Sequence, residues 1–250
     1  MTTQEFSAEF DILYNNLASN AAPPINAYEK SVFLTKAQSD IVIELYSGRN
    51  NLGLSFESNE EVREYLRPLI KQSEWSQITT PSDIYPGINC YGVSITRTTD
   101  NNKNPVLFTI KEEIRETYTN TDKSTYTIAY PVIPATQDTI HSILNNPFKG
   151  PKSGKRAIRL DDSENKIYLY FEKEPKNTWK YRETYLTHPS SIIIYEEGMN
   201  GLFVGYDKVG DSEQQCTLPL SLHRLILERA VLLAKMAYVG GQSQPQQTQE

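Results

Sequence analysis

One long apolar stretch near the carboxyl end, residues 217–239, constrains the fold of this chain more than any other feature. Pro219 suits the first turn of a helix, because the N–H that proline lacks would have no partner there. No Gly or Pro follows until Gly240 and Gly241, which are typical of a helix end. The stretch therefore predicts a single long helix.

The polar side chains of this helix fall in one narrow stripe when it is drawn at 100° per residue. The stripe contains Ser221, Arg224, Glu228 and Lys235. The apolar arc covers roughly 240°, whereas a helix that faces one core needs only about 100°. We therefore expect the helix to pack on its own domain by one side and on a neighbouring subunit by the other. A central core helix of a monomer is the alternative, and the charges disfavour a transmembrane span.

A second long helix is expected at residues 28–47, ending at Gly48. It has about the same length as the C-terminal helix, so the two could lie side by side. The candidate subunit interface combines both: Leu222, Leu225, Ile226, Arg229, Leu233 and Met236 of the C-terminal helix, and Leu34, Ile41 and Leu45 of the earlier one. His223 and Arg229 lie off the polar stripe, and either could reach the rim of the core or form an ion pair between subunits.

The hydrophobic pattern changes from helical to alternating after Trp75. Strands are expected near residues 91–97, 106–118 and 125–132, and we expect them to form an antiparallel meander. A hairpin should follow at residues 157–171, with further extended segments at 180–187, 191–195 and 201–206.

The predicted fold class is α+β, with helices from the N- and C-terminal ends packed together and a central antiparallel β-rich insertion. The expected parts are an N-terminal helical part at residues 1–75, a central β-rich domain at 76–216, the C-terminal helix at 217–239, and a flexible tail at 240–250.

Composition argues against several functional classes. The net charge of −6 disfavours a general nucleic-acid binder that works by neutralising phosphates. The N-terminus has no basic and apolar segment typical of an export signal. Cys90 and Cys216, together with three dispersed histidines, match no metal-ligand spacing. No cofactor motif and no catalytic constellation is present, so we expect neither a bound metal or cofactor nor an enzyme.

A basic loop is the one local charge feature of the sequence. It contains Lys149, Lys152, Lys155, Arg156 and Arg159, with no acidic residue among them. Either it is a solvated loop, or it docks on an acidic partner surface or on DNA phosphates.

Three segments of the chain resemble virion structural proteins of crAss-like bacteriophages. They are residues 27–38 (AYEKSVFLTKAQ), residues 137–159 with the run NPFKGP, and the helix with its lead-in at residues 216–235. The family is similar to neck ring proteins, which form layers of the head–tail connector beneath the portal. The resemblance has no catalytic residues to transfer.

The resemblance implies a ring of identical subunits, twelve in number, around the channel through which DNA leaves the head. Its partners would be the portal or adjacent ring and tail proteins, with genomic DNA passing through unbound by sequence and with no membrane contact. The subunit would be assembled in the host bacterial cytoplasm and reside in the neck or tail of the virion. A carbohydrate- or receptor-binding accessory protein, using Trp179, Tyr181 and Tyr185, is the alternative.

Overall fold

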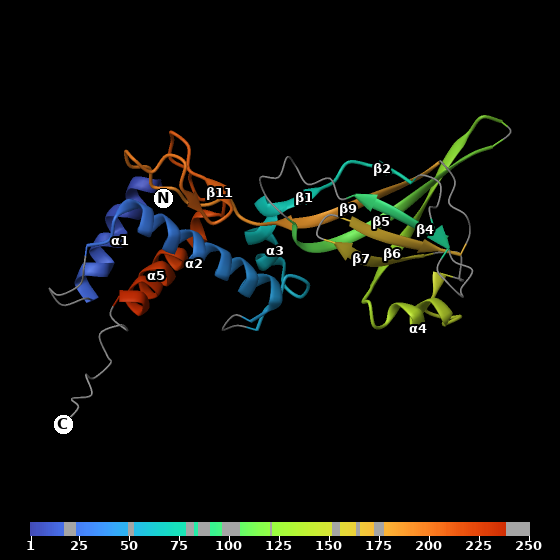
Figure 1. Ribbon diagram of the computed structural model, residues 1–250, viewed down its shortest axis with the longest axis horizontal. Coiled ribbons are helices and arrows are strands. Elements are labelled where there is room, and N and C mark those ends of the chain that lie inside the picture. Colours follow the sequence, from blue (N-terminus) through green and yellow to red (C-terminus); the bar gives the residue numbers. More distant parts are fainter. Residues whose placement is uncertain are drawn as a thin grey trace, which may run out of the picture. The chain divides into compact units, whose positions relative to one another are not determined.

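The computed structural model describes residues 1–17, 24–49, 53–78, 83–84, 91–96, 106–120, 122–151, 156–163, 166–172 and 178–238. The chain divides into two compact units. Unit 1 comprises Met1–Leu69 and His188–Glu250, and unit 2 comprises Ile70–Thr187 (Figure 1). Helices lie at both ends of the chain and a sheet rich in antiparallel pairs lies between them, so the predicted α+β class is confirmed.

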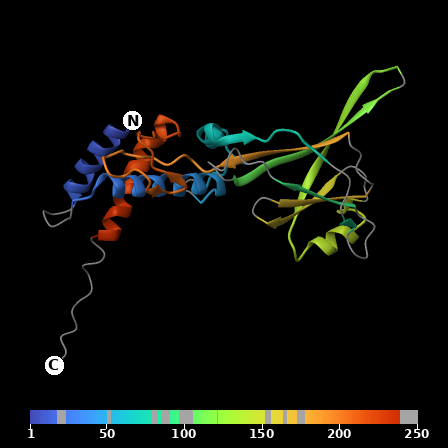
Figure 2. The same ribbon diagram turned by 45° about the horizontal axis from the view of Figure 1, so that its top comes forward.

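Unit 1 is built mainly from helices. They are α1 (Thr3–Leu17), α2 (Ala27–Ser47), α3 (Glu60–Leu66) with the short 3-10 helix η1 (Arg67–Leu69), and α5 (Leu220–Tyr238). The predicted helix at residues 28–47 is confirmed as α2, and Gly48 ends it at φ 73°. The structure adds a capping box of Asn26 and Glu29 at its start. Helix α5 packs against both α1 and α2 (Figures 1 and 2). In the part of the chain that the structure describes, no helix is both long and apolar enough to cross a membrane.

Helix α2 buries polar as well as apolar side chains. Its apolar row contains Leu34, Ala37 and Ile41, all buried. A second buried row is polar and binds the backbone of residues 190–194. Ser31 Oγ accepts from Ile194 N at 2.9 Å, Thr35 Oγ1 accepts from Ile192 N at 3.0 Å, and Gln38 Nε2 donates to Ser190 O at 3.1 Å. These three side chains recur every three to four residues, so one face of α2 satisfies an extended segment that belongs to no large sheet.

The same contacts explain where unit 1 resumes along the chain. Residues 76–216 were expected to form one β-rich domain, but the compact units divide the chain at Thr187 and His188. Residues after His188 follow α2 and then form the small hairpin of β10 (Phe203–Val204) and β11 (Asp207–Lys208). Periodicity shows that such a segment is extended, but it does not reveal which element takes up its hydrogen bonds.

Replacing Gly205 with alanine is expected to destabilise unit 1. Gly205 has a φ of +61°, and an added Cβ would lie 2.9 Å from Thr35 Cγ2 and 3.0 Å from Ser191 Oγ. The left-handed backbone costs a non-glycine residue about 1–2 kcal/mol, and overpacking adds about 1–3 kcal/mol. The free energy of unfolding is measured by urea titration followed by circular dichroism. Gly198→Ala is the control, because Gly198 has a φ of +96° but open space at its Cβ. Equal losses from the two substitutions would contradict the packing argument.

The described residues of unit 2 form a mixed sheet and one helix. Its strands are β1 (Ile70–Gln72), β2 (Ser76–Gln77), β3 (Asp83–Ile84), β4 (Tyr91–Thr96), β5 (Val106–Thr119), β6 (Thr125–Ala135), β7 (Ala157–Ser163), β8 (Lys166–Phe171) and β9 (Trp179–Thr187), and its helix is α4 (Ile140–Asn145). The described strands form a nine-stranded sheet in the order β1-β9-β5-β6-β7-β8-β4-β3, and β2 also pairs with β9. The β5–β6 and β7–β8 hairpins confirm two expectations from the sequence.

The expected meander of three consecutive strands is wrong. Strand β4 pairs with β8 rather than with β5, and β6 pairs in parallel with β7. The reason is that both faces of the β7–β8 hairpin are covered. Ala157, Ile167 and Leu169 pack into the main core of unit 2, whereas Ile158 and Leu160 pack beneath α4. A hairpin buried on both faces lies inside the sheet and needs neighbours on both edges.

Strand β6 changes partner along its length. It pairs with β5 from Thr125 to Pro131, and then with β7 from Val132 to Ala135. Strand β5 pairs with β9 from Val106 but with β6 only from Glu113 onward, so β5 and β6 are separate on the far side of the pair Glu113 and Pro131. A fork therefore opens in the sheet between β5 on one side and β6 with β7 on the other.

Candidate functional site

A groove lies between α2, α3 and α5 of unit 1. Its volume is about 700 Å3, and it is lined by Ile41, Glu44, Leu45, Arg49, Leu54, Asn59, Glu61, Val62, Tyr65, Leu222, Leu225, Glu228, Arg229 and Leu232. Seven of the fourteen lining side chains are aliphatic and five are charged. Such a groove suits an apolar side chain or helix face of another protein better than a polar small molecule.

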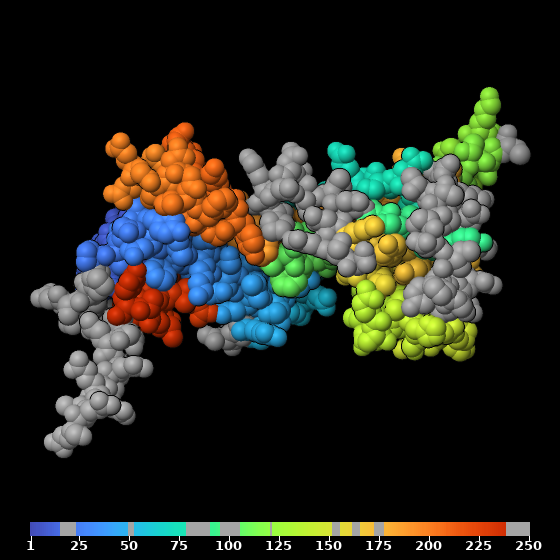
Figure 3. Space-filling view, viewed as in Figure 1, coloured from blue at the N-terminus to red at the C-terminus, as the bar shows by residue number. Residues whose placement is uncertain are grey.

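Helix α5 divides its apolar side chains between the core and the outside. Ile226 is 0% exposed, whereas Leu225 and Leu232 are each 49% exposed and Met236 is 67% exposed. The exposed positions follow one another at helical spacing, so they form a stripe along one side of the helix. Figure 3 shows α5 (red) at the surface of unit 1 beside α2 (blue). The helix therefore has a side that the described residues of its own chain leave uncovered.

The nine residues of the candidate subunit interface fall into two groups. Leu34, Ile41, Leu222 and Ile226 are buried in unit 1 and pack the chain's own core. Leu45, Arg229 and Leu233 are partly exposed, and Leu225 and Met236 are exposed. Leu34 and Ile226 are fully buried, whereas Ile41 and Leu222 line the groove, so the candidate surface comprises Ile41, Leu222, the second group and Leu232.

Arg229 and His223 have internal partners. The guanidinium of Arg229 forms an ion pair with Glu44 of α2, at the edge of the groove. His223 is buried rather than at the rim; its Nε2 donates to the carbonyl oxygen of Leu218 at 2.9 Å, and burial lowers its pKa. Arg229 therefore holds α5 to α2, and His223 joins α5 to the N-terminus, since its Nδ1 lies 2.9 Å from the amine of Met1.

The basic loop is only partly within the described residues. Lys149 is exposed and Arg156 is partly exposed, while Lys152 and Lys155 lie outside the described residues. Arg159 was grouped with them as a partner-docking residue, and its position in the structure contradicts that grouping. It is only 9% exposed, because it lies on β7 and points into unit 2, where Glu112 neutralises it. Along β7, Ala157 and Arg159 share one face, which is the inner one.

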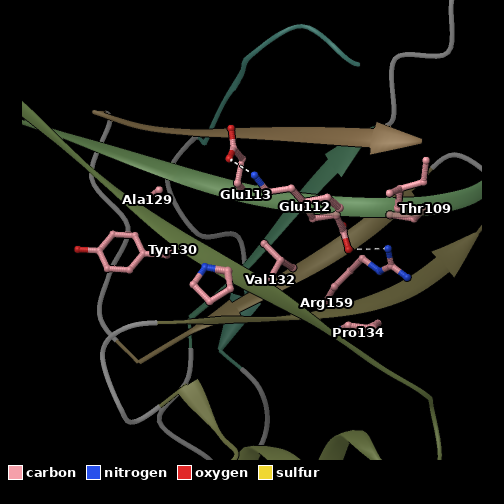
Figure 4. Close-up of a pocket in the computed structure, with 11 residues that line it drawn as sticks. Thr109, Glu112, Glu113, Ala129, Tyr130, Val132, Pro134 and Arg159 are labelled. Atoms are coloured by element: carbon pink, nitrogen blue, oxygen red, sulfur yellow. Dashed lines mark hydrogen bonds and ion pairs between the residues drawn. The ribbon is translucent and has the colours of Figure 1, made fainter. Parts of the chain in front are cut away.

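Arg159 and Glu112 bridge the fork of the sheet. Arg159 Nη1 lies 2.7 Å from Glu112 Oε2 (Figure 4). The hydroxyl of Tyr181 on β9 donates to Glu112 Oε1 at 2.6 Å. Burial raises the pKa of the Glu112 carboxyl, and the Arg159 guanidinium and Tyr181 hydroxyl act against that rise. The ion pair thus joins β5 to β7 where β6 no longer connects them.

A pocket of about 410 Å3 opens beside this ion pair. Its lining includes Thr109, Glu113, Tyr130, Pro131, Val132 and Pro134, as well as Glu112 and Arg159 (Figure 4). Among the residues that the structure describes, no cluster of three or more His, Cys, Asp or Glu could hold a metal ion. The charged groups Glu112 and Arg159 of its lining neutralise each other. We therefore interpret the pocket as a consequence of the separation of β5 from β6.

The aromatic side chains proposed for ligand binding are largely internal. Tyr181 and Tyr185 are buried, and Trp179 packs between Tyr130 and Phe171 at ring-centroid distances of 5.8 and 5.2 Å. Sugar-binding sites need exposed ring faces, whereas these rings cover the core of unit 2. The geometry therefore offers the accessory-protein alternative no binding surface at these residues.

Comparison with known proteins agrees with the ring-protein resemblance. A family model described as phage tail ring protein 3/4 matches residues 1–246. The chain belongs to this family of crAss-like phage ring proteins. It is 33% identical to "Ring protein 3" of Bacteroides phage crAss001, over 94% of this chain and 95% of that protein. It is also 30% identical to "Ring protein 4/5" of the same phage, over 96% of this chain and 94% of that protein.

Membership in the ring protein family makes the chain a structural component of a phage virion that assembles with other virion proteins. The exposed side of α5 is an apolar surface of unit 1. The sequence indicated this helix through its wide apolar arc. It did not indicate that Leu54, Val62 and Tyr65 would border the same groove, because nothing in the period of α3 shows which helix it packs against.

Proposed function

We propose that this chain is the repeating subunit of a closed ring in the head-to-tail connector, or neck, of a tailed phage. Identical copies, twelve in number, surround the channel through which DNA leaves the head, below the portal. The neighbours of the ring are the portal or adjacent ring and tail proteins. The subunit is made in the bacterial cytoplasm and becomes part of the virion there.

The uncovered side of α5 is the observation that carries this proposal. A ring subunit needs two different lateral surfaces, because each copy uses one surface for one neighbour and the other surface for the next. Such head-to-tail contacts form a ring when the rotation between copies closes. Leu225, Leu232 and Met236 provide one apolar surface beside a groove of about 700 Å3. A standard interface buries roughly 800 Å2 on each partner, and one helix side with its groove can supply a large share of that area.

The charge of the chain suits a channel through which DNA slides. With 31 acidic and 25 basic residues, the subunit has no overall attraction for phosphates that would hold DNA in place. The basic loop, of which Lys149 and Arg156 are the described exposed members, is then a candidate for docking on an acidic surface of an adjacent virion protein.

The double substitution Leu225→Glu with Leu232→Glu is expected to abolish ring formation. Two carboxylates would have to be buried without partners, which costs several kcal/mol each time the contact forms. Mass photometry counts the subunits per particle, and circular dichroism checks that the monomer keeps its fold. Incorporation into virions of a phage carrying the same substitutions tests the neck location.

Ile12→Glu is the matched control for this experiment. Ile12 lies on α1 of the same unit and is 58% exposed, but it does not line the groove. The control should assemble like the natural chain. Normal rings from the double variant would mean that the α5 groove is not a subunit contact, and a wild-type chain that stays monomeric and absent from virions would reject the ring itself.

A further inference from the structure

The end of the β5–β6 hairpin has two free edges. Strand β9 accompanies β5 only as far as the pair Glu116 and Trp179, so Thr117–Thr119 of β5 has no strand beside it among the described residues. Strand β6 pairs with β7 only from Val132 onward. The segment of β6 from Thr125 to Pro131 therefore has no strand among the described residues on the edge that faces away from β5. Figures 1 and 2 show this end of the hairpin (green) extending past the other strands of unit 2.

The backbone groups that face outward follow from the pairing within the hairpin. Asn120 N donates to Ser124 O at 2.8 Å, so these two residues form a hydrogen-bonded pair. Alternate pairs along an antiparallel ladder are hydrogen-bonded. Tyr118 and Tyr126 are therefore the next such pair. The residues that alternate with these hydrogen-bonded pairs direct their N–H and C=O groups away from the hairpin. These residues are Thr117 and Thr119 on β5, and Thr125, Thr127 and Ala129 on β6.

The chemistry of the β6 edge is unusual for a free edge. Residues 125–130 read TYTIAY, with five β-branched or aromatic residues and no charge, Gly or Pro. Folded proteins normally protect such edges with lysine, proline, bulges or short strands. The other edges of this sheet follow that rule: β3 has two residues, and the opposite edge is broken between β1 and β2 and carries Lys71 and Glu74.

Both faces of the hairpin end are also uncovered. Thr125, Tyr126, Thr127, Ile128 and Ala129 are all exposed, and Tyr126 is 47% exposed although its ring stacks on Tyr118 at a centroid distance of 5.0 Å. An isolated two-stranded hairpin is marginally stable in water. Pairing with a further strand on each side would therefore stabilise this end of the hairpin.

We propose that the hairpin ends of neighbouring copies join edge to edge, the β6 edge of one copy pairing with the β5 edge of the next, to form a continuous antiparallel β-ring. The inference rests on the proposed ring, and it names a second contact between its subunits besides the α5 groove.

A second copy of this chain is the occupant that the two edges fit. When copies are related by rotation, each β6 meets the β5 of its neighbour, and the two strands run in opposite directions as antiparallel pairing requires. Thr125 and Thr127 then lie against Thr117 and Thr119, so neither edge has a charge to desolvate. The contact is heterologous, and it closes after a full turn without leaving a free edge.

Hydrogen exchange of the full chain, as monomer and as assembled ring, tests this contact directly. The outward amides of Thr125 and Thr127 should exchange quickly in the monomer and become protected in the ring. The amides of Tyr126 and Ile128 should be protected in both states, because they pair with β5. Mass photometry establishes independently whether a ring has formed.

Thr127→Pro is the matching variant, with Thr127→Val as its control. Proline removes the outward N–H without breaking a hydrogen bond inside the hairpin, whereas valine keeps both the N–H and the branched Cβ. The proline variant should assemble about tenfold more weakly, since the carbonyl that faces Thr127 on the neighbouring β5 is left without a donor, which costs about 1–3 kcal/mol. The valine variant should assemble normally.

The outcomes separate this inference from the proposed function. Rings with unprotected outer amides, or equal assembly of the proline and valine variants, would overturn the β-ring and leave the ring subunit standing. A natural chain that forms no ring would reject both. If proline disrupts the hairpin itself, the amides of Tyr126 and Ile128 will exchange faster in the variant. The exchange of the natural chain, compared between monomer and ring, then decides whether the β-ring forms.

Discussion

Replacing Arg159 with methionine is expected to destabilise unit 2 by about 3–5 kcal/mol. The substitution leaves the Glu112 carboxyl buried without its cation, with only the Tyr181 hydroxyl as a partner, and it breaks the link between β5 and β7 across the fork. Both tryptophans of the chain, Trp75 and Trp179, lie in unit 2. Urea unfolding followed by tryptophan fluorescence therefore measures this unit by itself.

Arg156→Met is the control for this prediction. Arg156 precedes β7 and is only partly buried, so its loss should change the unfolding free energy of unit 2 by less than about 0.5 kcal/mol. A second test replaces both partners, Arg159 and Glu112, with leucine. This double variant should be much more stable than the Arg159 single variant, because no buried charge is left unpaired. If the single and double variants lost the same stability, side-chain packing rather than charge pairing would be the contribution of Arg159.

Replacing Ile226 with alanine is expected to destabilise unit 1 by about 2–5 kcal/mol. Ile226 is fully buried where α5 packs on the rest of unit 1, so the shorter side chain leaves a cavity. The adjacent Leu225 is 49% exposed, and Leu225→Ala should cost less than about 1 kcal/mol. Circular dichroism of the monomer in urea measures both losses, since unit 1 contains most of the helix.

The two substitutions should have opposite effects on assembly. Leu225→Ala should weaken the ring while the monomer stays stable, whereas Ile226→Ala should weaken the monomer more than the contact between monomers. Mass photometry under conditions where both variants are folded distinguishes the two. Similar losses of monomer stability from both variants would show that α5 is covered on both sides within one chain, and the case for a lateral contact there would fail.

Local signals in the sequence predicted the elements of this fold well. The ends of α2 follow from Asn26, Glu29 and Gly48, whose roles depend on neighbouring backbone atoms alone. The hairpins follow from alternating patterns separated by turn residues. For the candidate site, the width of the apolar arc of α5 predicted an uncovered side, and Leu225 and Met236 lie on it.

Pairings between distant elements could not be predicted in this way. The parallel pairing of β6 with β7 depends on where β6 leaves β5, and nothing in the local pattern marks that point. The buried row of Ser31, Thr35 and Gln38 looks like a solvated helix face until residues 190–194 lie against it. Arg159 likewise looks like a member of a basic loop, because its partner Glu112 is 47 residues away in the sequence.

The construction of unit 1 from both parts of the chain has a consequence for biosynthesis. Helices α1 and α2 leave the ribosome first, but α5, which covers their apolar sides, is made only after the whole of unit 2. At 5–20 residues per second, α2 waits roughly 10–40 s for its partner. Unit 2 can fold as it emerges, so the nascent protein passes through a stage with a finished sheet and an unprotected pair of helices. Chaperone binding during translation should therefore concentrate on the first 47 residues.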